Sequence, residues 1–343
     1  MREGIAEGTA PAAADLSVQG KSPARAPAAR VHGPLWRFCF KKYQIQGFIW
    51  LLPAIVLLVM FSVIPIVWAF VYSFTDWGFL STISFIGFEN YATAFADSMF
   101  WDSLLNSILF TVCGLLLGNI AALALAEMLY NYASEKLASA MRFCFLLICA
   151  VPSVVSLLVW SKVIFLPTGG SATGVMNGLL GLFGGQGTDW YLSNDPNIVR
   201  LSIILTGFPF MGGTSFLIYY AGLQGINTEV IEASRLDGLG SFMRVFRLDL
   251  PYLRGTIKYF LVTGLIGGLQ NYNIQVVLEL SSGAAMVPGY YIYLTGLSSS
   301  FRNDEIDVLG GMGYACAMGV IMFLITLALT IIQNVFIRSK EGD

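Results

Sequence analysis

The stretch Glu232-Ala233-Ser234-Arg235-Leu236-Asp237-Gly238, followed by Leu250-Pro251, is a polar, charged insertion between two long apolar segments. The flanking residues 201–223 and 257–278 are long enough to lie in lipid. The backbone and charges of the insertion need water or a partner, so we expect it at a membrane face. The insertion therefore indicates a membrane protein that presents an ordered polar segment at one surface.

Local signals divide this insertion into two short helices. Asn227 is a good N-cap residue with Glu229 in the first turn, and Asp237-Gly238 is a typical helix end. A second helix is predicted from Ser241, with apolar and basic side chains on opposite sides: Phe242, Val245 and Phe246 against Arg244 and Arg247. Leu250-Pro251 is expected to turn the chain back toward the membrane.

The composition places the chain among polytopic membrane proteins. Of 343 residues, 56% are hydrophobic and 12% charged, and the mean hydropathy is +0.70. There is no basic stripe, so nucleic acid is not an expected partner. His32 is the only histidine, which excludes a histidine-based metal site or catalytic triad. We expect the five cysteines to be small buried hydrophobic residues: Cys39, Cys113, Cys144, Cys149 and Cys316.

The chain is predicted to have two parts. Residues 1–42, rich in Ala, Pro and Gly, are expected to form a disordered cytoplasmic tail, and residues 43–343 a transmembrane domain. Six apolar runs of about twenty or more residues predict an all-α bundle of six transmembrane helices. The runs are residues 47–72, 104–130, 141–165, 198–223, 257–280 and 309–337.

Charge asymmetry predicts the orientation. Lys and Arg concentrate in the tail, around Lys136 and Arg142, in residues 235–258 and at the C-terminus. These segments are therefore expected inside, with both termini cytoplasmic, as an even number of spans requires. The acidic segment with Asp76, Glu89, Asp97 and Asp102 is then outside. The expected location is the cell membrane, as a multi-pass protein.

The predicted outer loops are rich in aromatic residues, among them Trp77, Trp101, Trp190 and Tyr191. These side chains are expected to be interfacial anchors. An alternative is that residues 85–101 and 174–190 form short helices along the outer surface, where a soluble partner docks. The sequence leaves both open.

The fifth apolar run contains an unusual polar cluster, Gln270-Asn271-Tyr272-Asn273, with Gln275 following. Polar groups at membrane depth cost free energy and are expected to face the interior or a cavity. Amides and a tyrosine offer uncharged donors and acceptors, and an aromatic face can stack on a sugar ring. The alternative is hydrogen bonding between helices. Glu127 and Glu279 lie near the ends of predicted spans and so are poor candidates for a buried proton-carrying residue. This disfavours an ion-coupled transporter.

The insertion resembles the EAA loop of binding-protein-dependent ABC importer permeases, whose pattern is E-A-A-x-x-D-G-A followed by L-P. Glu232, Ala233, Asp237, Gly238 and Leu250-Pro251 match the spacing, with Ser234 and Leu239 replacing alanines. Other stretches are similar to the sugar-permease branch: residues 73–77, 86–91, 104–107, 150–153 and 221–224. The segment 281–285 departs from the usual T-x-G-G-P turn.

The resemblance implies a type I importer permease with the coupling loop at residues 226–251. Its partners would be two ATPase subunits, a second and homologous permease subunit, an extracytoplasmic solute-binding protein and the bilayer. ATP and Mg would be bound by the ATPases, with no cofactor, metal or catalytic site in this chain. The implied ATPase-coupling residues are Glu232, Ala233, Ser234, Arg235, Asp237, Gly238, Leu250 and Pro251. An amphipathic helix anchored on lipid head groups is the alternative.

The resemblance also implies solute contacts in the fifth span, at positions that align with Gly264, Gly268 and Asn271. With the neighbouring cluster and the kinked third and fourth spans, the substrate-binding candidates are Asn271, Gln270, Tyr272, Asn273, Gly268, Ser153, Cys149, Phe210 and Thr214. Packing is the competing interpretation for the third and fourth spans, and Ser153 could instead bond a carbonyl freed by Pro152.

The function implied is import of a neutral sugar or oligosaccharide by alternating access, in which ATP-driven motion of the ATPases moves the Glu232 helix. One alternative is import of another solute, such as a glycerol phosphate or a polyol conjugate. A phosphate would favour a basic residue facing the cavity, and the fifth span has none. A second alternative is a membrane scaffold that binds an ATPase and moves nothing, which the amide cluster disfavours.

Overall fold

The computed structural model describes residues 42–78, 83–132, 134–167, 174–208, 213–301 and 311–338. The chain divides into two units at residue 57, each considered by itself. In the first, α1 (Lys42–Leu58) is an apolar helix that contains Pro53. Throughout the described ranges, the regular structure is helical apart from one isolated bridge between Thr75 and Phe85. The predicted all-α class is confirmed, and the tail at 1–41 lies outside the described residues.

Three helical stretches are long and apolar enough to cross a membrane: Ile49–Tyr72, Ser98–Asn131 and Met312–Gln333. They coincide with the first, second and sixth predicted spans. The elements concerned are α1, η2 (Val59–Val63), α2 (Ile64–Tyr72), α4 (Ser98–Tyr132) and α16 (Met312–Arg338). The π-type turn η2 ends two residues before Pro65. Because Pro65 has no N–H, it cannot continue the α-helical hydrogen-bond ladder.

The third predicted span is sharply bent. It consists of α5 (Glu135–Ala150), α6 (Ser153–Val159) and η3 (Trp160–Ile164), with 96° between the two halves. The break falls at Val151, whose ψ of 127° is extended, as expected for a residue before proline. If this pair forms one span, the structure has four candidate spans among its described residues.

The fourth and fifth predicted spans are not single helices. The fourth is divided into α8 (Pro196–Leu205) and α9 (Gly213–Gln224), and the fifth into α13 (Arg254–Leu269) and α14 (Asn273–Leu278). The prediction of a continuous helix over residues 257–280 is therefore wrong. The helix is broken at residues 270–272, within the polar cluster. The total of six spans stays a prediction.

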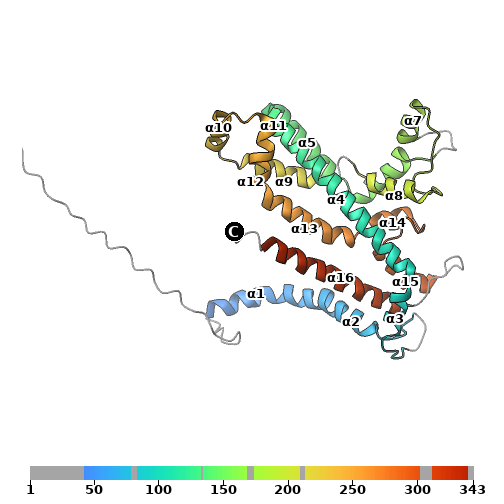
Figure 1. Cartoon of the computed structure of the whole chain (residues 1–343). Helices are drawn as coiled ribbons and strands as arrows, with labels where there is room; N and C mark the ends of the chain where they lie inside the picture. The colour runs from blue at the N-terminus through green and yellow to red at the C-terminus, as the bar shows by residue number, and fades with distance from the viewer. Residues whose placement is uncertain are drawn as a thin grey trace, which may run out of the picture. The chain divides into compact units, whose positions relative to one another are not determined.

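Within the second unit, α4 packs against α5, α8, α9 and α13 (Figure 1). At its start, Asp97 accepts hydrogen bonds from the hydroxyls of Tyr291 and Tyr314, at 2.8 and 2.7 Å. Along its length α9 and α13 pack against it. At its end lie the short helices of the polar insertion. The elements around the start are α3 (Glu89–Ala96), α15 (Pro288–Phe301) and α16.

The structure corrects part of the prediction for the aromatic residues of the predicted outer loops. Short helices are present at α3 and at α7 (Val175–Leu182), as the alternative expected. Trp190 and Tyr191 are each only 8% exposed and pack with Phe165 in a core cluster, so they are not interfacial anchors. The cysteine prediction is also wrong in part, because Cys144 and Cys149 are exposed in the isolated chain, while Cys39 lies outside the described residues.

Candidate functional site

The polar insertion begins with a well-capped helix, α10 (Thr228–Leu236). The side chain of Asn227 accepts a hydrogen bond from the backbone N–H of Glu229 at 3.0 Å, which satisfies one of the free donors of the first turn. The predicted start of this helix is therefore confirmed. Ile231 packs inward against the core cluster that contains Leu129, Leu223 and Leu253, so α10 is held on α4, α9 and the approach to α13.

The outward side of α10 presents most of the residues of the recognised pattern. Six residues of the stretch from 232 to 238 are exposed, and we call them the docking face after the role that the recognised pattern implies for this stretch: Glu232, Ala233, Arg235, Leu236, Asp237 and Gly238. Leu236, which the sequence interpretation passed over, is 89% exposed. Ser234 is the exception, since it is 6% exposed and its hydroxyl donates to the carbonyl of Ile231 at 2.7 Å. The inward position of Ser234 does not fit its predicted role as a residue that contacts the ATPase.

Gly238 ends α10 for a backbone reason. The N–H of Gly238 donates to the carbonyl of Arg235, and the N–H of Leu239 to that of Ser234, which together form a Schellman motif. This geometry puts Gly238 at φ 78°, a conformation that residues with a side chain rarely adopt. The space beside it is open, so the turn and not crowding within the chain requires glycine.

The second helix of the insertion differs from its prediction. It is made of α11 (Ser241–Arg244), the π turn η5 (Val245–Asp249) and α12 (Leu250–Tyr252), which leads into α13. Phe242 and Phe246 are 76% and 54% exposed, whereas Arg244 is 5% exposed. The two arginines predicted on one side are separated: Arg247 is exposed, whereas Arg244 is buried with polar partners. Pro251 lies in the first turn of α12, where its missing N–H costs no hydrogen bond.

A cavity of about 460 Å³ lies beside α4, bounded by α8, α9, α13 and α14. Its polar lining carries hydroxyls and amides: Ser107, Thr111, Asn119, Thr206, Ser215, Thr263, Asn271 and Gln275. Among the described residues that line it, none is charged. The cavity can therefore offer hydrogen-bond donors and acceptors to an uncharged polar solute without imposing a charge.

The glycines of α13 shape this cavity. Gly264 and Gly268 both line it, and both face α4 at close range. A Cβ on Gly268 would lie 2.5 Å from Cγ2 of Thr111, and one on Gly264 would meet the side chain of Leu115. These two positions therefore hold glycine for close helix packing, and the space they leave belongs to the cavity.

The predicted amide cluster is divided by the break between α13 and α14. Asn271 lines the cavity, and its Oδ1 accepts the N–H of Asn273 at 3.1 Å, which starts α14. Gln270 and Asn273 are exposed and do not line it. Tyr272 stacks on Tyr293 at a centroid distance of 6.4 Å. Asn271 and the following Gln275 thus line the cavity, whereas Gln270 and Asn273 do not.

The remaining candidates meet in a second cavity of about 340 Å³ at the bend of the third predicted span. Cys149, Ser153 and Thr214 all line it, together with Ser156 and Trp160. Ser215 lines both cavities, so the two adjoin at α9. Phe210 lies outside the described residues.

Sequence reasoning missed the contribution of α4. Ser107, Thr111 and Asn119 line the first cavity, and their spacing by multiples of four residues puts them on one face of a helix. This pattern was readable within the second apolar run. The hydroxyl of Thr111 is buried without a hydrogen-bond partner among the described residues.

Comparisons with known proteins give a consistent picture. A family model described as the binding-protein-dependent transport system inner membrane component matches residues 114–341. The sulfoquinovosyl glycerol transport system permease protein of Agrobacterium fabrum is 29% identical over 296 residues, covering 85% of this chain and 90% of that protein. The arabinooligosaccharides transport system permease protein of Bacillus subtilis is 26% identical over 313 residues, covering 90% and 93%.

A further relative and a solved structure extend this similarity. The lactose transport system permease protein of Rhizobium radiobacter is 28% identical over 306 residues, covering 87% of this chain and 96% of that protein. A chain of a bacterial ABC transporter involved in import of the acidic polysaccharide alginate superposes with a TM-score of 0.72 at 22% identity, covering 87% and 96%. The likeness to this structure concerns the fold.

Proposed function

Because the chain belongs to the family of binding-protein-dependent transport system inner membrane components, we propose that it is the permease subunit of an ATP-driven importer of a sugar or oligosaccharide. The named relatives carry such solutes, and they match this chain over nearly their whole length. The observation that carries the proposal is the uncharged cavity of hydroxyls and amides between α4 and α13. It lies where an importer needs a path through its helices.

The proposed arrangement is a type I permease with six spans and both termini in the cytoplasm. The broken fourth and fifth spans suit this role, since interrupted helices are tolerated at membrane depth where they line a cavity. The distribution of Lys and Arg supports placing α10 on the cytoplasmic side.

The docking face on α10 is proposed to bind an ATPase subunit. Its exposed carboxylates, Arg235 and the apolar Leu236 lie on the side of α10 away from the core. On the opposite side, Ile231 packs into the core cluster. A short helix bound in a cleft of a moving partner transmits that motion to the spans attached to it. The chain itself then needs no catalytic residue, because separate ATPase subunits bind ATP and Mg.

A neutral solute is the form of cargo that the first cavity favours. Asn271, an exposed amide of the lining, can exchange hydrogen bonds with sugar hydroxyls. The described residues of the lining include no cation that would hold a phosphate, which disfavours a glycerol phosphate as cargo. The exposed Gln270 and Asn273 are proposed to face a second permease subunit. A solute-binding protein outside the membrane would deliver the sugar.

The test is reconstitution of the permease pair with its ATPases and binding protein in liposomes. ATP hydrolysis is measured with a panel of neutral saccharides and with glycerol phosphate. We expect stimulation by at least one saccharide, and no stimulation by any of them in an intact assembly contradicts the proposal. Asn271→Ala should lower uptake of that saccharide by about tenfold, the effect of losing one good hydrogen bond. Unchanged uptake would exclude Asn271 from the pocket.

A further inference from the structure

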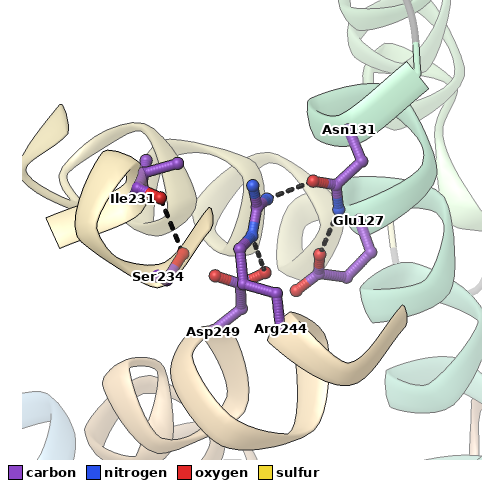
Figure 2. Close-up of polar contacts among 6 residues, drawn as sticks. All are labelled: Glu127, Asn131, Ile231, Ser234, Arg244 and Asp249. Atoms are coloured by element: carbon purple, nitrogen blue, oxygen red, sulfur yellow. Dashed lines mark hydrogen bonds and ion pairs between the residues drawn. The ribbon is translucent and has the colours of Figure 1, made fainter. Parts of the chain in front are cut away.

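A buried polar cluster joins the polar insertion to the end of α4 (Figure 2). Arg244 lies at its centre, 5% exposed, and its Nε is 3.1 Å from Oδ2 of Asp249, which is fully buried. The terminal Nη2 of Arg244 donates to Oδ1 of Asn131 on α4. Asn131 in turn donates to Oε2 of Glu127 at 2.9 Å, one turn earlier on the same helix. We call these four residues the Arg244 cluster.

The π turn η5 explains how Arg244 and Asp249 meet. The residues are five apart, a spacing that places side chains on different sides of an α-helix. A π turn has more residues per turn, with i to i+5 hydrogen bonds, and so brings positions 244 and 249 to one side. Turns of this kind have a cost and are frequent at functional sites. Figure 2 shows the Arg244 guanidinium between Asp249 and Asn131 of α4.

The contact with α4 has both polar and aromatic parts. Besides the bond to Asn131, the guanidinium of Arg244 lies over the ring of Tyr130, at 5.4 Å from its centroid. A planar group with a fork of donors can hold Asp249 and Asn131 at once, which a lysine ammonium cannot do with the same geometry. Arg244 therefore fixes both the distance and the orientation of α11 relative to α4.

The charges of the Arg244 cluster make it sensitive to the loss of the cation. One guanidinium lies among two carboxyl groups, and Oε1 of Glu127 and Oδ1 of Asp249 are buried without hydrogen-bond partners among the described residues. Removing Arg244 alone would leave buried carboxylates uncompensated, a strongly unfavourable arrangement. Removing all three charges together would avoid that penalty and abolish only the connection.

We propose that Arg244 is a positioning residue that holds the segment 241–252 against the end of α4, so that the docking helix, α4 and α13 move as one body. This inference rests on the proposed role of α10 as the ATPase-binding helix. The apolar anchor at Ile231 fixes α10 itself. The Arg244 cluster fixes the segment that follows it, before the chain enters α13. Without the cluster, the segment 241–252 is free to shift against α4, and motion of α10 is not passed through this segment to α13.

The experiment measures the distance between α11 and α4 in the assembled transporter. Spin labels are placed at Phe242→Cys and Met128→Cys, which are 76% and 51% exposed, after replacement of the native cysteines. Distance distributions are recorded in liposomes without nucleotide and with MgATP. With Arg244 present we expect one narrow distribution that MgATP does not change. In Arg244→Met we expect the distribution to widen by about twofold or more, as a local opening would produce, and to shift with MgATP.

Three further variants separate positioning from folding. Arg247→Met removes an exposed charge from the same π turn and should keep the narrow distribution. The combined variant Arg244→Met, Glu127→Gln and Asp249→Asn carries no buried charge and is expected to assemble in normal amounts while still showing the wide distribution. Arg244→Lys should give an intermediate width. A narrow, nucleotide-independent distribution in the combined variant overturns the inference, whatever the behaviour of Arg244→Met.

Recovery of the ATPase subunits with the permease distinguishes the two proposals. Arg244→Met and the combined variant should retain the ATPases at the unsubstituted level, because the docking face is intact. Glu232→Ala should lose ATPase and keep the narrow α11–α4 distance. Should the unsubstituted permease recover no ATPase, the docking role of α10 is contradicted, whereas a wide distribution in the unsubstituted protein contradicts the positioning role alone.

Discussion

At the scale of single residues, backbone conformation and burial show that residues of the recognised pattern have different roles. Gly238 and Ser234 both belong to the recognised pattern, yet Gly238 closes the helix at φ 78° and Ser234 faces inward, bonded to its own helix. Neither role concerns the surface chemistry of docking. The exposed residues of the docking face, Glu232, Arg235 and Asp237 among them, are the ones free to contact an ATPase.

Gly238→Val tests the residue-scale interpretation. A side chain at this positive φ costs about 1–2 kcal/mol and favours an unwound helix end. We therefore expect ATPase binding to the permease to weaken by about tenfold, which corresponds to 1.4 kcal/mol. Gly240→Val is the matched control, since Gly240 has φ −66° and open space around it. Equal binding of ATPase by the two variants would show that the turn is not needed for docking.

At the scale of elements, breaks in helices create the cavities. The bend at Val151 opens the second cavity, and the interruption at residues 270–272 turns Asn271 toward the first. Between the breaks, α13 comes close enough to α4 that Gly268 leaves no room for a side chain beside Thr111. The width of the first cavity is therefore set by the small residues on two facing helices.

Substitution of Gly268 by leucine tests this geometry. The added side chain must displace Thr111 or push α13 from α4, and either change fills or distorts the cavity. We expect saccharide uptake to fall by about tenfold or more, on the order of the 1–3 kcal/mol that overpacking costs. In Gly267→Leu, where nothing lies within 4 Å, uptake should stay near the unsubstituted value. Similar losses in both variants would argue for a general effect on the helix.

At the scale of the whole molecule, the two ends of α4 carry different kinds of structure. The start is surrounded by α3, α15 and the tyrosine pair on Asp97, and the end by the docking helix and the Arg244 cluster. A transporter needs this difference, because one side receives the solute and the other receives force. The basic residues of the insertion are the basis for proposing that the second side is cytoplasmic.

Labelling with a membrane-impermeant thiol reagent tests the orientation. Phe183, beyond the end of α7, and Phe242 on α11 are 88% and 76% exposed. In a cysteine-free background, Phe183→Cys should react in intact cells and Phe242→Cys only after the membrane is opened. Reaction of both in detergent is the control for accessibility. The reverse pattern in intact cells would contradict cytoplasmic termini.

Several features were predictable because they depend on local chemistry. Asn227 and Gly238 mark the limits of α10, since a cap and a positive φ are properties of a few neighbouring residues. The apolar runs around α4 and α16 follow from length and hydropathy. The pocket was predicted less well: Asn271 reaches the cavity, while Gln270 and Asn273 do not, because the backbone break rotates successive side chains apart.

By itself the sequence determined that this is an all-helical membrane protein with a capped polar helix between two apolar segments, because hydropathy, caps and spacing act within one stretch of chain. Only the tertiary structure decided that Arg244 is buried, that α4 supplies one wall of the cavity and that Asn271 faces it. These outcomes depend on partners distant in sequence, such as Asn131 for Arg244 and Thr111 for Gly268. Contacts of that kind are set when helices pack, and no local pattern specifies them.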